Sequence, residues 1–160
     1  MAFDCLLRID GIQGESKISG HEDEIDILSW SWGMSQSGTT HVGGGGGAGK
    51  VNINDITFTK YVDKATTKLM RTCCNGEHIK EAVLTVRKAG KDPIDYIKIT
   101  FSQILVASLE TGGTGEQDRL TENVNFNFGK VKIGYTPQKE DGTADAEIEM
   151  NWNIEKNIEE

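Results

Sequence analysis

A glycine-rich segment at Gly44–Lys50 is the first place where the sequence could support chemistry, because it matches the opening of a phosphate-binding loop. Such a loop needs a Ser or Thr after its lysine to hold magnesium, and a helix whose N-terminus faces the phosphates. Here Val51 follows Lys50, and residues 51–60 alternate apolar and polar side chains as a strand does. Because glycine permits almost any backbone conformation, the segment is better interpreted as a flexible arm than as a nucleotide site.

Metal and nucleophile chemistry also lack support in the sequence. His21 begins a stretch that resembles a zinc-protease helix, but Ile25 stands where the second histidine would be. Cys73, Cys74 and His78 form a conceivable metal cluster, yet adjacent cysteines cannot easily both bind one tetrahedral ion. No Gly-x-Ser-x-Gly elbow occurs, and nothing fixes a histidine beside a cysteine for nucleophilic work. We therefore expect no enzyme, no metal and no cofactor.

The composition argues against several other classes of function. A length of 160 residues suits one domain, which we place at 1–160. The net charge of -8 and the scattered Lys and Arg residues argue against a nucleic-acid partner. No apolar run approaches the about 20 residues of a membrane-spanning helix. Asp4, Arg8 and Asp10 interrupt the N-terminal apolar residues, so we expect no cleaved secretory signal.

Strands must position whatever site the chain has, because most of the sequence alternates apolar and polar residues with a period of two. Strands are predicted at Phe3–Ile9, Ile25–Met34 and around Ile148–Ile154. The second strand has two unlike faces. Its large side chains are Leu28, Trp30, Trp32 and Met34. Its other face is small and polar, with Ser29, Ser31 and Gly33. Such a face either lines a cavity or assembly lumen, or is small only so that strands can pack closely.

Three later segments alternate and then slip in phase by one residue, before Ile56, before Ile104 and at Gly129. A one-residue slip exchanges the buried face unless a bulge or sharp bend absorbs it. Bent strands can close a barrel, so the slips favour a curled sheet, with strands buried on both faces as the alternative. Only Asp63–Asn75 shows helical spacing, followed by Gly76 as a stop. The predicted fold is mainly β, a bent two-sheet β-barrel of about seven strands with one short α-helix alongside.

Several long strings of the sequence point to one family. Glu24–Gly38, which reads EIDILSWSWGMSQSG, closely resembles the Hcp family, the haemolysin-coregulated proteins of the type VI secretion system. The resemblance continues in order through further strings: Gly43–Lys50, Phe58–Asp63, Val86–Gly90, Asp118–Val124, Tyr135–Lys139 and Trp152–Ile154. Because these strings span nearly the whole chain, the resemblance is specific.

The resemblance implies a barrel of two sheets whose six copies form a ring with an open channel. Rings would stack into an inner tube inside a contractile sheath, behind a VgrG-type spike, and would shelter small effector proteins. The protein would be cytoplasmic before firing and then secreted or delivered without a signal peptide. Ser31, with Ser29 beside it, would face the cargo. The family's extended loop, which contacts neighbouring subunits and rings, matches Gly43, Gly44, Gly45, Gly46, Gly47, Ala48 and Gly49. A monomeric β-barrel that binds a small ligand is the alternative.

Overall fold

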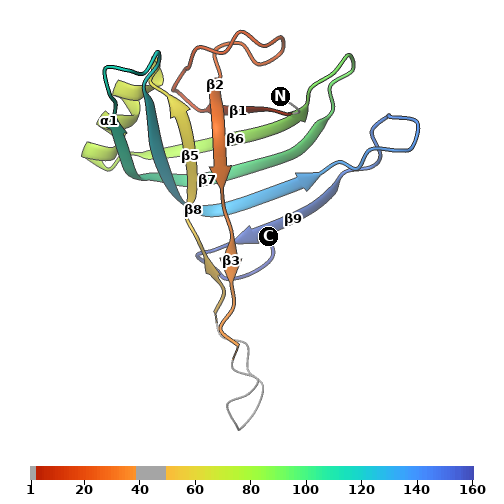
Figure 1. Ribbon diagram of the computed structural model, residues 1–160. Helices are drawn as coiled ribbons and strands as arrows, with labels where there is room; N and C mark the ends of the chain where they lie inside the picture. The colour runs from red at the N-terminus through yellow and green to blue at the C-terminus, as the bar shows by residue number, and fades with distance from the viewer. Residues whose placement is uncertain (1–2, 39–49) are drawn as a thin grey trace.

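The computed structural model describes residues 3–38 and 50–160, and these form strands with one helix (Figure 1). The strands alternate inward apolar and outward polar residues, as the period of two predicts. None of the helical structure in these two ranges is long and apolar enough to cross a membrane. The elements are β1 Phe3–Ile9, β2 Ile25–Ser31, β3 Met34–Ser35, β4 Asn52–Ile53, β5 Ile56–Tyr61, α1 Ala65–Asn75, β6 His78–Lys88, β7 Asp95–Gly112, β8 Thr121–Tyr135 and β9 Ile148–Asn153.

Six strands close into a barrel in the order β5-β2-β1-β6-β7-β8, because β5 also pairs with β8. β8 is long enough to pair with two different strands along one of its edges. Its first half pairs antiparallel with β5, and its second half pairs antiparallel with β9. The short strands β3 and β4 form a separate two-stranded sheet below the barrel (Figure 1). The prediction of a mainly β, bent barrel with one short helix is confirmed.

The phase slips before Ile104 and at Gly129 lie opposite each other on β7 and β8. Strand pairing continues across them with no residue inserted. Gln103 has a φ of 55°, and a Cβ on Gly129 would lie 2.4 Å from the Gln103 Oε1 atom. Both strands therefore exchange their buried faces at one shared bend, and Phe101 and Ile104 stay in the same core. This finding favours bent strands over strands buried on both faces.

The other slips have different origins. The one before Ile56 is a break between β4 and β5 rather than a bend within one strand. The predicted strand at Ile25–Met34 ends early, at Ser31, and its pairing with β5 shifts between Ile27 and Ser29. Leu28 at this shift is exposed, as is Met34 in β3. The predicted inward face is confirmed for Trp30 and Trp32, which pack against the core. It is wrong for Leu28, which lies at the bulge, and for Met34, which lies in the separate sheet of β3 and β4.

Side-chain hydrogen bonds mark the start of helix α1, and a glycine ends it. The Ala65 amide donates to Asp63 Oδ1 at 2.9 Å, and the Asp63 amide donates to Thr66 Oγ1 at 3.0 Å. These bonds satisfy amides at the helix start that have no partner within the helix. Gly76 ends the helix with a φ of 70°, a conformation that glycine adopts without strain. The predicted stop at Gly76 is confirmed, and the helix begins two residues after the predicted Asp63.

Aromatic side chains fill the interior of the barrel. Phe58, Phe101 and Phe126 are fully buried, and the Phe58 and Phe126 rings lie 5.3 Å apart in an edge-to-face arrangement. Trp32 packs on this cluster, 6.4 Å from the Phe101 ring, and its Nε1 donates to the Asn54 carbonyl at 3.0 Å. The inside of the barrel is therefore core, and side chains available to a partner lie on its outer surface.

Candidate functional site: a neutral polar face on the barrel

Two rows of polar side chains cross the outer surface of β2, β5 and β8. Inward residues such as Phe58 and Val124 pair directly with each other, so the residues on either side of them point outward. In register across the three strands, the first row is Ser31, Thr57 and Asn125, and the second row is Ser29, Thr59 and Asn123. We call these six residues the polar face. Its two serines were predicted from the sequence, and strand pairing brings the other four residues beside them.

Hydrogen bonds fix the polar side chains within each row. Thr57 Oγ1 donates to Asn125 Oδ1 at 2.6 Å, and Asn125 Nδ2 donates to Ser108 Oγ on β7 at 2.6 Å. In the second row, Thr59 Oγ1 donates to Asn123 Oδ1 at 2.7 Å. Each asparagine is therefore held in one orientation by its neighbour on the next strand.

The two serines differ from the rest of the face. Both are exposed, and within the described residues neither hydroxyl has a hydrogen-bond partner. A hydroxyl can both donate and accept, so each serine is available to an incoming molecule. The two exposed hydroxyls therefore suit contact with a partner molecule.

The polar face carries no charge, although the chain as a whole has 25 acidic and 17 basic residues. The nearest charged position along the second row is Glu110, which lies opposite Asn123 on β7. Hydroxyls and amides can both donate and accept hydrogen bonds. Because these groups are uncharged, they neither attract nor repel a molecule over distance, so the face can contact molecules of either charge.

A buried ionic cluster lies on the core side of the same strands. Lys60 and Glu122 are a cross-strand pair, 1% and 2% exposed, and they form an ion pair. Lys60 Nζ also lies 3.0 Å from Asp63 Oδ1 and donates to the Tyr61 carbonyl at 2.8 Å. Thr66 Oγ1 of α1 donates to Glu122 Oε1 at 2.6 Å. The cluster thus ties β5, β8 and the start of α1 together beneath the polar face.

This buried ionic cluster was not predicted from the sequence. The signal was present, because Lys60 follows Ile56 and Phe58 at the inward positions of β5. Glu122 likewise precedes Val124 and Phe126 at the inward positions of β8. A charged residue at an inward position on each of two strands predicts a buried pair, but only when the two strands are known to be neighbours.

The other sequence candidates remain apart from the polar face. The predicted contact loop Gly43–Gly49 lies outside the described residues. His21 contacts Glu24 at 2.9 Å, and His78 is exposed on β6. Within residues 3–38 and 50–160, no three His, Cys, Asp or Glu residues gather where they could hold a metal ion. The three cysteines are free, and burial raises the pKa of the Cys5 thiol.

Comparison with known proteins decides the family. Residues 6–135 match the family described as "Type VI secretion system effector, Hcp". The chain belongs to the Hcp family. Protein hcp1 of Pseudomonas aeruginosa is 52% identical over 161 residues, which cover 99% of each chain. The crystal structure of Hcp1 from Salmonella typhimurium has a TM-score of 0.83 at 35% identity and covers 100% of both chains. A structure described as a type six secretion system protein has a TM-score of 0.93 at 28% identity, covering 99% of this chain and 100% of that one.

The Hcp assignment agrees with the fold of the chain. The family match begins in β1 and ends at the last residue of β8, so it includes every strand of the closed barrel. All six residues of the polar face fall inside the matched range. The chain is therefore a type VI secretion protein of the Hcp family, and its outer polar face belongs to the Hcp barrel itself.

Proposed function

We propose that the chain forms rings of six copies that stack into the inner tube of a type VI secretion machine, and that the polar face lines the channel and contacts small effector proteins. The observation that carries the second part is the neutral, hydrogen-bonded row of Ser31, Thr57 and Asn125 on the outside of a filled barrel. Family membership supports the first part. In this proposal a contractile sheath surrounds the tube, and a VgrG-type spike caps it.

A neutral lining suits a protein that must hold cargo and then release it. A typical hydrogen bond contributes only about 0.5–1.5 kcal/mol net, because water replaces it on release. The Ser29 and Ser31 hydroxyls would supply such bonds, while the paired asparagines and threonines keep the surface flat. A charged lining would select cargo by charge and would hold it through longer-range attraction.

The proposed route follows from this role. The protein would assemble in the cytoplasm and leave the cell as part of the expelled tube, without a cleaved signal. The loop Gly43–Gly49 would contact neighbouring subunits and the adjacent ring. In the sequence this loop lies between β3 and β4, which form a separate sheet outside the closed barrel (Figure 1), and this supports the assignment.

The alternative, a monomeric barrel for a small ligand, has weaker support. A binding barrel needs an apolar cavity with a few converging polar groups. Here Phe58, Phe101 and Phe126 are fully buried in the interior and contact one another. Space for a ligand would have to be created by moving these rings, which a close-packed core resists.

Light scattering after size-exclusion chromatography tests the ring. Six copies of 17.5 kDa give a mass of about 105 kDa, against 17.5 kDa for a monomer. A single species near the larger mass is the expected result. A monomer at high protein concentration would refute the ring and favour the binding barrel.

Substitution of Ser31 tests the cargo face. We expect Ser31→Gln to reduce co-purification of a bound effector protein about tenfold without changing the ring mass, because a longer side chain displaces contacts on a flat surface. The matched control is Ser19→Gln, the same change at an exposed position in the connection between β1 and β2, outside the polar face. Equal effector retention by the Ser31 variant and the control would refute the assignment of this face to cargo.

A further inference from the structure

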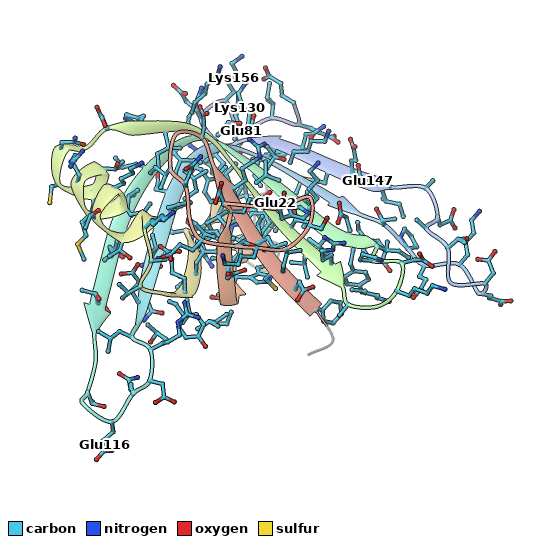
Figure 2. All side chains as sticks on the ribbon, turned by 90° about the horizontal axis from the view of Figure 1, so that it is seen from above. Glu22, Glu81, Glu116, Lys130, Glu147 and Lys156 are labelled. Atoms are coloured by element: carbon cyan, nitrogen blue, oxygen red, sulfur yellow. The ribbon has the colours of Figure 1, made fainter. Side chains whose placement is uncertain are left out.

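The connection between β8 and β9 is an acidic hairpin at one end of the molecule. Residues 136–147 carry Glu140, Asp141, Asp145 and Glu147 against one base, Lys139. All five are exposed, and a bridge between Gln138 and Ala144 holds the two arms together. Figure 1 shows this hairpin projecting beyond the barrel at the end opposite α1, and Figure 2 shows the same separation from above. We call residues 136–147 the acidic hairpin.

Exposed apolar side chains surround the base of the acidic hairpin. Tyr135 is 39% exposed, and Ile148, its partner across β8 and β9, is 63% exposed. The Tyr96 ring lies 5.2 Å from Tyr135 and 5.6 Å from Phe3, which is itself 39% exposed. Lys88 Nζ lies 5.0 Å from the centre of the Tyr96 ring. Aromatic residues gathered on a surface beside charged ones are typical of protein interfaces.

The opposite end of the molecule carries a basic helix face. Lys64, at the start of α1, and Lys68 and Arg71 within it recur at helical spacing and are all exposed. Within residues 3–38 and 50–160, none of the three forms an ion pair. They are therefore available to pair with acidic groups from another molecule.

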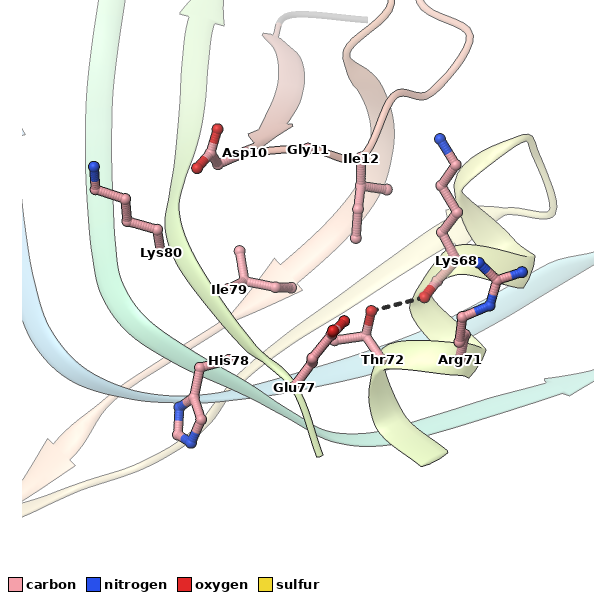
Figure 3. A pocket seen from close by; sticks show the side chains of 10 residues that line it. All are labelled: Asp10, Gly11, Ile12, Lys68, Arg71, Thr72, Glu77, His78, Ile79 and Lys80. Carbon is pink, nitrogen blue, oxygen red and sulfur yellow. Dashed lines mark hydrogen bonds between the residues drawn. The ribbon is translucent and has the colours of Figure 1, made fainter. Parts of the chain in front are cut away.

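A surface cavity of about 440 Å³ lies beside this helix face (Figure 3). Ile12 and Ile79 give it an apolar part, and Lys68, Arg71 and Lys80 contribute positive charge. Its lining also includes three other titratable side chains, Asp10, Glu77 and His78. The cavity thus combines an apolar part with a rim of mixed charge in which bases outnumber acids.

We propose that the ring closes when the acidic hairpin of one copy, with Tyr135 and Ile148 at its base, docks against the basic face of α1 and the adjacent cavity on the next copy. The inference rests on the proposed function, since it assumes that copies of this chain form a ring. A closed ring needs two different surfaces on each subunit that fit each other. The acidic hairpin and α1 provide such surfaces at opposite ends of the molecule (Figure 2).

Charge explains why this pairing is favoured over others. Two copies that each carry a net charge of -8 repel each other unless opposite charges meet at the contact. The Glu147 carboxylate lies over Gly134, in a pocket that Lys98 and Lys132 of the same copy also line. The other three acids of the hairpin, Glu140, Asp141 and Asp145, would face the three bases of α1 and remove this repulsion locally. A polyanion such as nucleic acid fits the cavity less well, because it has no cation to place against Asp10 and Glu77. The hairpin instead brings Lys139, which can face those two acids.

Charge reversal tests the pairing. We expect Lys68→Glu/Arg71→Glu to raise the protein concentration needed for half assembly about tenfold, measured as mass by light scattering across a dilution series. Glu140→Lys/Asp145→Lys should have a similar effect. The chain that carries all four changes should regain assembly, because both partners are reversed together. The matched control is Lys17→Glu/Lys156→Glu, two exposed lysines outside the proposed contact, which should assemble like the parent chain.

The outcomes separate this inference from the proposed function. A parent chain that is monomeric refutes the ring and the pairing together. A parent ring whose assembly is unchanged by the two double reversals refutes only the pairing. Failure of the four-fold variant to regain assembly also refutes it, provided that circular dichroism shows the variant folded. Recovery in the four-fold variant supports the pairing and shows that the double reversals did not act by unfolding the chain.

Discussion

Loss of the Lys60 ammonium group should destabilise the barrel more than loss of the Glu122 charge. Lys60 is 1% exposed and contacts two carboxylates, those of Glu122 and Asp63, so Lys60→Met leaves both without their cation. Removing one partner from a buried ion pair costs about 3–5 kcal/mol. A domain of this kind has a free energy of unfolding of about 5–15 kcal/mol, so the loss would be a large share of the total.

The Glu122→Gln change should cost less, about 1–2 kcal/mol. It keeps the volume of the side chain and an oxygen that can accept from Thr66, and Lys60 retains Asp63 at 3.0 Å and the Tyr61 carbonyl. Glu122 Oε2 is buried and has no hydrogen-bond partner among the described residues, so its replacement by an amide loses no bond there. The double variant should cost less than the sum of the two single changes, because the two residues act on each other.

Urea unfolding followed by tryptophan fluorescence measures these differences. All variants must be compared at one protein concentration, because ring assembly would itself stabilise the folded chain. The control is Lys156→Met, whose ammonium pairs at 3.4 Å with the exposed Glu160 and should change stability by less than about 0.5 kcal/mol. Additive single and double variants, or a larger loss from Glu122→Gln than from Lys60→Met, would refute the reasoning.

Three further changes test separate parts of the fold. Gly129→Ala should cost about 1–3 kcal/mol in urea unfolding, because its Cβ would lie 2.4 Å from Gln103 Oε1, and adding Gln103→Ala should recover part of the loss. Gly76→Ala should cost about 1 kcal/mol, since its φ of 70° strains any residue with a Cβ although the surrounding space is open. The neighbouring Glu149 raises the pKa of Glu147, because protonated Glu147 donates a hydrogen bond to the Glu149 carboxylate, and the raised pKa makes folding less favourable as the pH rises above the ordinary range of a glutamate. Glu147→Gln should therefore raise the melting temperature more at pH 7 than at pH 5, as seen by circular dichroism, and an equal change at both would contradict this.

Local patterns predicted the parts of the fold that depend on neighbouring residues. The period of two located β1 and β9, the helical spacing and the stop at Gly76 located α1, and the slip at Gly129 located the bend. The bulge after Ile27 escaped prediction, because its position depends on how β2 pairs with β5. Strand pairing between distant segments is set by closure of the whole barrel rather than by local sequence.

The same reason limited prediction of the candidate site. Ser29 and Ser31 could be found because they alternate with two tryptophans within one strand. Thr57 and Asn125 lie 68 residues apart, and only the pairing of β5 with β8 brings them into hydrogen-bond contact. No pattern within either strand distinguishes these two residues from ordinary exposed polar residues.

The filled interior constrains how this chain could enclose cargo. A single barrel whose centre holds Phe58, Phe101 and Phe126 has no room for another molecule, and the polar face lies on its convex outer side. Such a face can surround a cargo protein only if several copies turn it toward a common axis. That requirement needs a closed ring rather than a pair, because two convex surfaces cannot enclose a space between them. The polar face and the two charged surfaces thus become parts of one proposal. In it, the acidic hairpin and the basic face of α1 close the ring, and the polar face lines its channel.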